Sequence, residues 1–131
     1  MSISSTNGPI VLIGAGNMGG AMLAGWLRNG VPGSSVVVID PGPSEAMRTI
    51  MADAGARHMT AAPADMVAGV LSLAVKPQAM DAVLPPLKTL VGPKTVVVSV
   101  AAGKTLAYLE RHLGEAAMVR AMPNTPALIG R

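Results

Sequence analysis

The hydrophobic residues of this chain are gathered into short runs that are almost continuous in apolar side chains. The clearest runs, rich in Val, Ile and Leu, occupy residues 10–13, 36–39, 70–75 and 95–100. A strand with one face in water alternates apolar and polar positions, whereas a strand covered on both faces is apolar throughout. The runs therefore predict strands buried on both faces. Weaker runs predict a third strand at residues 57–60 and a sixth at residues 117–122.

The segments between these strands have helical character and recognisable ends. Met18, Met22 and Trp26 recur at a spacing of four, so they share one side of a helix. Ser44 is suited to cap the next helix, with Glu45 in its first turn. We expect helices at residues 18–28, 44–55, 63–68, 78–84 and 105–113, a break at Pro85-Pro86, and Gly114 as the last stop. This alternation predicts an α/β protein with a doubly wound, mainly parallel sheet of about six strands and helices on both faces.

Length and composition favour one soluble domain. The chain has 131 residues, of which 50% are hydrophobic and only 13% charged, and this balance excludes a disordered chain. No apolar run approaches the roughly 18 residues of a membrane span. The first nine residues are Ser-rich and uncharged, unlike a signal peptide, so we expect a flexible segment at residues 1–9 and a domain at residues 10–131. The absence of cysteine fits a reducing compartment, and we expect a cytoplasmic protein.

The net charge of +3 does not indicate a dedicated anionic surface, because the ten basic residues are scattered without a run of Lys or Arg. One Trp, one Tyr and no Phe leave few aromatic rings to stack on bases. We therefore expect no nucleic-acid partner and no membrane partner. No His-Asp or paired-carboxylate arrangement stands out, so we expect no metal site and no catalytic part for His58 or His112.

Directly after the first predicted strand, the chain reads G-x-G-x-x-G from Gly14 to Gly19. In this pattern Gly14 permits a tight turn, Gly16 lets a pyrophosphate approach the backbone, and Gly19 lets the helix lie close to the strand. The unpaired amides at the start of the helix then face the phosphates. The pattern alone is weak in a chain with fifteen glycines, and a packing turn without a ligand is the alternative. Its place between a strand and a helix favours a Rossmann-type dinucleotide-binding domain.

An acidic residue is expected at the end of the second strand of such a domain. Asp40 follows the run at residues 36–39 and lies 21 positions after Gly19. Its carboxylate could accept hydrogen bonds from the adenosine ribose hydroxyls and repel a 2′-phosphate, which favours NADH. Ser44 and Arg48 lie just downstream and could hold a 2′-phosphate if Asp40 turned away. Alternatively, Asp40 shapes the turn before Pro41.

The residues that follow the later strands are small or are prolines, as suits loops pressed against a flat ligand. Lys76 is the one charge after the fourth strand and could reach a phosphate or ribose oxygen; the alternative is a solvated surface lysine. Four segments together resemble the pyrroline-5-carboxylate reductase family: I-G-A-G-N-M-G at residues 13–19, L-A-V-K-P at 73–77, V-S-V-A-A-G at 98–103 and R-A-M-P-N-T-P at 120–126. They span nearly the whole chain from Ile10, and the last two are the most specific.

The resemblance implies hydride transfer from NADPH or NADH to the C=N carbon of 1-pyrroline-5-carboxylate, which gives L-proline. It places the pyrophosphate against the glycine turn, the adenosine side along the loop after the fourth strand, and the nicotinamide ribose near the loop after the fifth. Together, the glycine motif with its acidic residue and the resemblance predict cofactor contacts at Gly14, Ala15, Gly16, Asn17, Met18, Gly19, Asp40, Ala74, Val75, Lys76, Pro77, Ala101, Ala102 and Gly103; Gly19 and Asp40 come from the motif. Asn124 and Thr125 would approach the nicotinamide and substrate, and no residue is identified as catalytic.

Two departures from the family qualify this picture. Many members carry a small hydroxyl residue where Asp40 stands and are associated with NADPH. Members also continue for about as many residues again, with a helical half that forms the dimer and most substrate contacts, whereas this chain ends at Arg131. We therefore expect cofactor binding without turnover, and homo-oligomers only through that half. The alternatives are another dehydrogenase or reductase of the β-hydroxyacid or deazaflavin-linked type, and a non-catalytic nucleotide-binding module.

Overall fold

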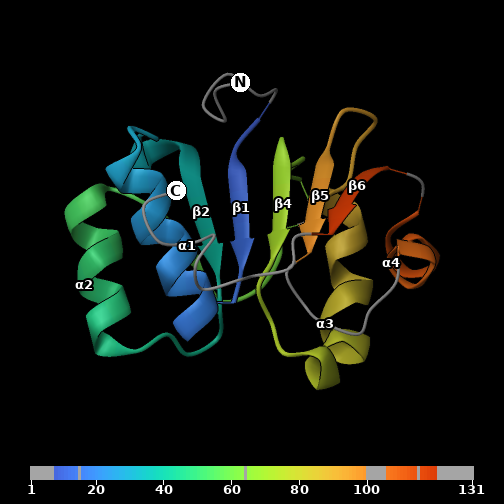
Figure 1. Ribbon diagram of the computed structural model, residues 1–131, viewed down its shortest axis with the longest axis horizontal. Helices are drawn as coiled ribbons and strands as arrows, with labels where there is room; N and C mark the ends of the chain where they lie inside the picture. Colours follow the sequence, from blue (N-terminus) through green and yellow to red (C-terminus); the bar gives the residue numbers. More distant parts are fainter. Residues whose placement is uncertain (1–7, 15, 64, 100–105, 115, 121–131) are drawn as a thin grey trace.

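The strands form one parallel sheet. The computed structural model describes residues 8–14, 16–63, 65–99, 106–114 and 116–120. Its six strands lie in the order β3-β2-β1-β4-β5-β6, and every neighbouring pair is parallel. In Figure 1 the labelled arrows of β1, β2, β4, β5 and β6 point the same way. The strands are β1 (Ile10–Ile13), β2 (Val36–Ile39), β3 (Arg57–Met59), β4 (Val70–Leu73), β5 (Val96–Ser99) and β6 (Ala117–Arg120).

Helices cover both faces of this sheet, which confirms the predicted α/β class. They are α1 (Asn17–Arg28), α2 (Glu45–Ala54), α3 (Met80–Leu87) and α4 (Leu106–Leu113), with short 3-10 turns at η2 (Gly33–Ser35), η3 (Pro77–Ala79) and η4 (Lys88–Leu90). In Figure 1, α1 and α2 lie with the β2 half of the sheet, and α3 and α4 with the β5 half. No helix in the described part of the chain is long and apolar enough to cross a membrane.

The burial pattern of β1 shows why its sequence is apolar throughout. Val11 and Ile13 belong to a core cluster with residues of α3 and α4, whereas Ile10 and Leu12 belong to a second cluster with residues of α1 and α2. All four residues of β1 are buried, as are all four of β2 and β4. Because successive side chains of a strand point to opposite faces, a strand between two helical layers must be apolar at every position.

The order of the strands fixes where a ligand can bind. From β1 the chain builds outward through β2 to β3, then returns to pair β4 with the other side of β1. The direction of winding therefore reverses between β1 and β4. In an open parallel sheet the crevice at this point, outside the carboxyl ends of the strands, is where ligands bind.

The ends of two helices agree with the sequence prediction. The Ser44 hydroxyl accepts a hydrogen bond from the Met47 amide at 3.2 Å, and Glu45 is the acidic residue of the first turn of α2. Gly114 ends α4 with a φ of +86°, and its amide donates to the Glu110 carbonyl at 2.8 Å. The capping residues that the sequence offers are therefore used as expected.

The predicted helix at residues 63–68 was wrong, because none of its described residues is helical. The segment is short, between Pro63 and Gly69, and tertiary contacts outweigh its local preference. The Ala68 amide donates to the Leu90 carbonyl at 2.8 Å, and the Ala68 carbonyl accepts from the Thr95 hydroxyl at 2.6 Å. These bonds hold the backbone in an extended approach to β4.

The predicted break at Pro85-Pro86 was also wrong, since both prolines lie inside α3. They occupy its last turn on the exposed side, together with the exposed Asp81 and Ala82 four positions earlier. The carbonyls that lose an amide partner are therefore on the solvent side of the helix. Buried Leu84 and Leu87 hold the other side against the core, so packing outweighs the cost of the prolines.

Candidate functional site

The glycine turn after β1 is built by close backbone contacts. Gly14 has a φ of +95°, a conformation that favours glycine, and its amide donates to the Ile39 carbonyl at 3.0 Å. A Cβ on Gly14 would lie 2.9 Å from the Ala74 carbonyl oxygen. A Cβ on Gly19 would lie only 2.0 Å from the Gly14 carbonyl oxygen. These two glycines therefore allow α1 to begin directly against the ends of β1 and β4.

Gly16 differs from its two neighbours in the motif. It is exposed, its φ of −80° suits any residue, and a Cβ built on it would meet nothing within 4 Å. Neither backbone strain nor packing inside the chain requires glycine here. The open space at Gly16 is instead what a ligand pressed against the backbone would need.

The amino end of α1 favours an anion. Gly16 precedes the helix and provides no capping side chain, and the first turn contains no acidic residue. A helix start has amides without intrahelical partners and carries the positive end of the helix dipole. Asn17 and Met18 supply backbone amides of this first turn, and the half-buried Met18 also lines a small hollow along α1. The start of α1 can therefore hold a phosphate group, as the sequence predicts.

Asp40 lies directly after β2, and hydrogen bonds of its amide, its carbonyl and its carboxylate help to fix it. Its amide donates to the Met59 carbonyl at 3.0 Å, and its carbonyl lies 2.8 Å from Nε2 of His58. Its carboxylate accepts from the Gly42 amide at 2.7 Å. The last bond joins the Asp40 side chain to the amide two positions further on and so closes a turn. The alternative interpretation of Asp40 as a turn former therefore has direct support.

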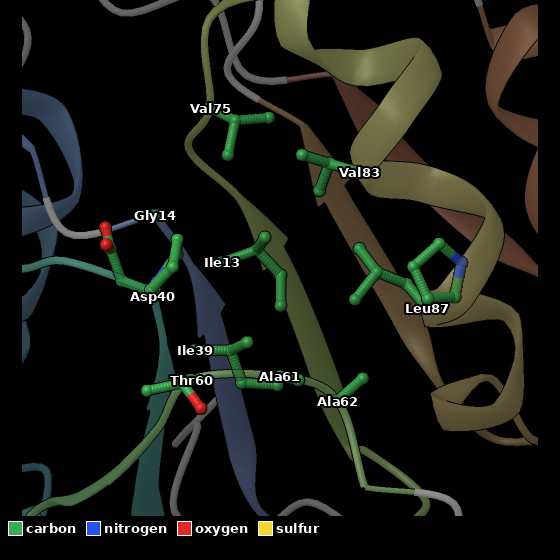
Figure 2. A pocket seen from close by; sticks show the side chains of 12 residues that line it. Ile13, Gly14, Ile39, Asp40, Thr60, Ala61, Ala62, Val75, Val83 and Leu87 are labelled. Atoms are coloured by element: carbon green, nitrogen blue, oxygen red, sulfur yellow. The ribbon is translucent and has the colours of Figure 1, made fainter.

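Two hollows meet at Asp40. The apolar pocket, of about 280 Å³, is lined by the ends of β1 and β2, by the segment after β3 and by α3. Figure 2 shows Ile13, Ile39, Val75, Val83 and Leu87 around it, with the Asp40 carboxylate at its border near Gly14. The polar hollow, of about 470 Å³, lies between the starts of α1 and α2 and is lined by Gly16, Gly20, Ala21, Asp40, Gly42, Ser44, Ala46, Met47 and Ile50.

The residues predicted to contact the cofactor after β4 lie in different places. The Ala74 amide extends the sheet by donating to the Ile13 carbonyl at 2.9 Å, and Val75 lines the apolar pocket. Lys76 is exposed and lines neither hollow, and Pro77 begins η3. Ala15, Ala101, Ala102, Gly103, Asn124 and Thr125 lie outside the described residues. The structure therefore brings together the glycine turn, Asp40 and Val75, and leaves Lys76 at the surface.

Sequence reasoning missed two parts of this site. The wall that α3 contributes, with Val83 and Leu87 four positions apart, was hidden by the expectation of a helix break. The contact from His58 to Asp40 joins residues 18 positions apart and has no sequence motif. The pairing of β2 with β3 places Ile39 beside Met59 and hence Asp40 near His58. Recognition of this pairing is the signal that could have revealed the contact.

The other titratable contacts lie between α3 and α4. Tyr108 donates a hydrogen bond to the Asp81 carboxylate, and this bond, with lesser contributions from desolvation and the negative charge of Asp81, raises the pKa of Tyr108 to about 12. The ring of His112 lies beside that of Tyr108, with centroids 4.6 Å apart. Among the described residues, no three His, Cys, Asp or Glu side chains are grouped as a metal site would require.

Comparison with known proteins agrees with this geometry. Residues 9–103 match the family described as "NADP oxidoreductase coenzyme F420-dependent". Pyrroline-5-carboxylate reductase of Pseudomonas aeruginosa is 42% identical over 123 residues, which cover 92% of this chain and 44% of that protein. The enzyme of Pasteurella multocida is 38% identical over 126 residues, which cover 92% and 45%.

A solved structure gives the same result for the fold. The pyrroline-5-carboxylate reductase of Coxiella burnetii superposes with a TM-score of 0.77 at 31% identity, covering 93% of this chain and 46% of that one. The resemblance that the sequence motifs indicate is therefore confirmed. This chain spans less than half the length of the relatives it matches.

Proposed function

Because this chain belongs to the family of coenzyme F420-dependent NADP oxidoreductases, we propose that it is the cofactor-binding half of a pyrroline-5-carboxylate reductase. The proposed reaction passes hydride from NADPH or NADH to the C=N carbon of 1-pyrroline-5-carboxylate and yields L-proline. One observation carries the proposal beyond the sequence relatives: the open space at Gly16 lies at the uncapped start of α1 and borders the polar hollow.

The residues of the site fit a dinucleotide part by part. The first amides of α1 would hold the pyrophosphate, and the missing Cβ of Gly16 leaves it room. The apolar pocket would take the adenine ring, since its wall from β1, β2 and α3 is almost free of charge. The Asp40 carboxylate, at the border of both hollows, would accept hydrogen bonds from the ribose hydroxyls.

The reaction asks little more of this half of the enzyme. NAD(P)H supplies the hydride, and its nicotinamide ring must be held against the imine carbon with water kept out. The imine must also be protonated or hydrogen-bonded. Asp40 is the only charged residue among the described residues that line the two hollows. We therefore assign most of the substrate contacts and the proton donor to residues outside the described site, above all to the part of the enzyme that this chain does not span.

Cofactor preference follows from Asp40 in this proposal. A 2′-phosphate in the polar hollow would face the Asp40 carboxylate and, beside it, the Ser44 hydroxyl, which already accepts from the Met47 amide. Arg48 is exposed and does not line this hollow. NADH should therefore bind at least as tightly as NADPH.

The family description also names coenzyme F420, a deazaflavin, and so favours the deazaflavin-linked alternative as the second candidate. That reaction would transfer hydride between F420 and NADP on the same glycine turn. The named relatives at 38–42% identity are pyrroline-5-carboxylate reductases, and they give the first proposal precedence.

Calorimetric titration of the 131-residue chain with NADH and NADPH tests the proposal, and binding of neither would overturn it. Oxidation of each cofactor in the presence of 1-pyrroline-5-carboxylate, monitored by absorbance, then tests whether this chain binds the cofactor without turning over the substrate. We expect negligible turnover, because the proposal assigns the proton donor and the cover against water to the part of the enzyme that this chain does not span. Turnover on the order of 10 per second, an ordinary enzyme value, would show that this chain holds a complete active site.

A further inference from the structure

The backbone of Asp40 is held from both sides by neighbouring residues of one strand. Its amide donates to the carbonyl of Met59, and its carbonyl lies 2.8 Å from Nε2 of His58. A carbonyl oxygen can only accept, so Nε2 carries the hydrogen and donates it. Both peptide groups that flank the Asp40 side chain are thus fixed to β3.

The position of His58 explains why a side chain makes the second bond. β3 ends at Met59, and the next residues, Thr60 to Ala62, turn away to line the apolar pocket. In a parallel ladder, the donor to the Asp40 carbonyl would be an amide two residues after Met59. The imidazole of His58 reaches this carbonyl from within β3, so the segment after the strand is free to form the pocket wall.

The Asp40 carboxylate is hydrogen-bonded to the backbone that follows it. It accepts from the Gly42 amide at 2.7 Å and borders both hollows. Rotation of the peptide after Asp40 would displace the Gly42 amide and the carboxylate together. The repulsion between a carboxylate and a bound phosphate grows as the distance between them falls. The orientation of the peptide after Asp40 therefore controls how strongly the Asp40 carboxylate repels a phosphate.

We infer that His58 is a positioning residue that holds the Asp40 carboxylate at the border of the two hollows and so sets the discrimination between NADH and NADPH. The inference rests on the proposed function, because it assumes that a dinucleotide occupies this site. His58 acts through Asp40 and needs no contact of its own with the cofactor.

The test compares His58→Leu with His58→Gln. Leucine removes the donor, whereas the side-chain amide of glutamine can replace Nε2 as a donor. We expect His58→Leu to lower the ratio of Kd for NADPH to Kd for NADH by about threefold to tenfold, and His58→Gln to restore most of it. His112→Leu is the matched control, because its ring nitrogen lies 3.1 Å from the Tyr108 carbonyl on α4 and should leave the ratio unchanged.

A second measurement needs no cofactor. The exchange rate of the Gly42 amide with water, measured by NMR, reports its bond to the Asp40 carboxylate. It should rise in His58→Leu and remain near the unaltered value in His58→Gln and His112→Leu. If the unaltered chain binds neither cofactor, the proposed function fails, while this exchange rate still decides whether His58 holds Asp40.

Two results would overturn the inference. An equal loss of affinity for both cofactors in His58→Leu would show that His58 merely supports the fold. An unchanged Kd ratio and an unchanged Gly42 exchange rate would show that Asp40 holds its position without His58. If His58→Leu fails to fold, His58→Gln decides the matter: a loss of discrimination in that variant, despite a retained donor, would also contradict the inference.

Discussion

Helices α1 and α2 start at the same edge of the sheet, each just after a strand, yet their first turns are built differently. α1 begins after Gly16, without a capping side chain and without an acidic residue in its first turn. α2 begins after Ser44, whose hydroxyl accepts from the Met47 amide, and carries Glu45 in its first turn. The first helix thus leaves its positive end to a ligand, whereas the second satisfies and neutralises its own.

In the proposed function, this difference acts in the polar hollow between the two helix starts. This hollow has Gly16 and Gly20 on one side and Ser44 and Met47 on the other, with Asp40 between them. A phosphate in the hollow would be attracted toward the start of α1 and repelled by the Asp40 carboxylate, while the capped start of α2 would attract it less. The contrast predicts that a pyrophosphate binds at α1 and that a further phosphate near α2 is disfavoured.

The largest expected effect comes from adding a side chain at Gly19, where the start of α1 lies against the turn after β1. The Cβ of a Gly19→Ala variant would lie 2.0 Å from the Gly14 carbonyl oxygen, so the helix must move or the turn must distort. We expect the free energy of unfolding to fall by about 3 kcal/mol or more. Chemical denaturation followed by circular dichroism measures this change.

Gly20→Ala is the matched control for that variant. A Cβ at Gly20 would meet only the Met47 sulfur at 3.5 Å, an ordinary contact. Because alanine is the better helix former, Gly20→Ala should gain about 0.5 kcal/mol of stability. Similar losses in both variants would mean that α1 does not lie against Gly14 as described.

Gly16→Val should remove binding while the fold remains. Apart from its chain neighbours, no described residue lies within 4 Å of a Cβ at this position, so we expect a stability change of about 1 kcal/mol or less, mainly from a poorer residue before the helix. The same side chain would occupy the space given to the pyrophosphate. NADH affinity should fall by about 100-fold or more, equivalent to about 2.7 kcal/mol.

Calorimetry with NADH measures the loss in Gly16→Val, and Gly25→Ala near the far end of α1 serves as the control. A Cβ at Gly25 would meet only the side chain of Arg28, at 3.8 Å. This variant should bind as the unaltered chain does. Unchanged affinity in Gly16→Val would place the ligand elsewhere and remove the functional difference between the two helix starts.

Much of this arrangement could be predicted because it depends on residues that are close in sequence. The strands at residues 10–13 and 36–39, the glycine turn and the Ser44 cap are local patterns, and each was predicted where the structure has it. The errors arose where tertiary contacts decide. The backbone bonds of Ala68 override the helical preference of its segment, and buried Leu84 and Leu87 keep α3 intact across two prolines.

The site was predictable to the same extent. Spacing identified Gly14, Gly16, Gly19 and Asp40, because the motif is local. Spacing could not show that Asp40 separates two hollows or that His58 bonds to its carbonyl, since both facts require β3 beside β2 and a wall from α3. The alternatives for Asp40 were ribose contact and turn former, and its bond to Gly42 shows that turn formation does not require it to leave the hollow.

Asp40→Ser tests the repulsion in the hollow. Serine can still accept from the Gly42 amide, so the turn should remain, while the negative charge is removed. We expect NADPH affinity to rise relative to NADH by about threefold to tenfold. Asp53→Ser, on the exposed side of α2, removes the same charge at a position that lines neither hollow and should change the ratio little. NADPH binding tenfold tighter than NADH in the unaltered chain would contradict this reading of Asp40.

The smallest expected effect, and the one that examines α2 directly, is that of Ser44→Ala. Loss of the capping hydroxyl leaves the Met47 amide without its side-chain acceptor and should lower the free energy of unfolding by about 1 kcal/mol. Thr49→Ala, which removes a hydroxyl that bonds within the same helix to the Glu45 carbonyl, should cost less. Because the cap serves the helix and not a ligand, the Kd for NADH and the Kd for NADPH should both stay within about twofold of the unaltered values. A selective loss of NADPH affinity in Ser44→Ala would show that the Ser44 hydroxyl holds a 2′-phosphate. The start of α2 would then bind an anion, as is proposed for the start of α1, and the contrast between the two helices would no longer hold.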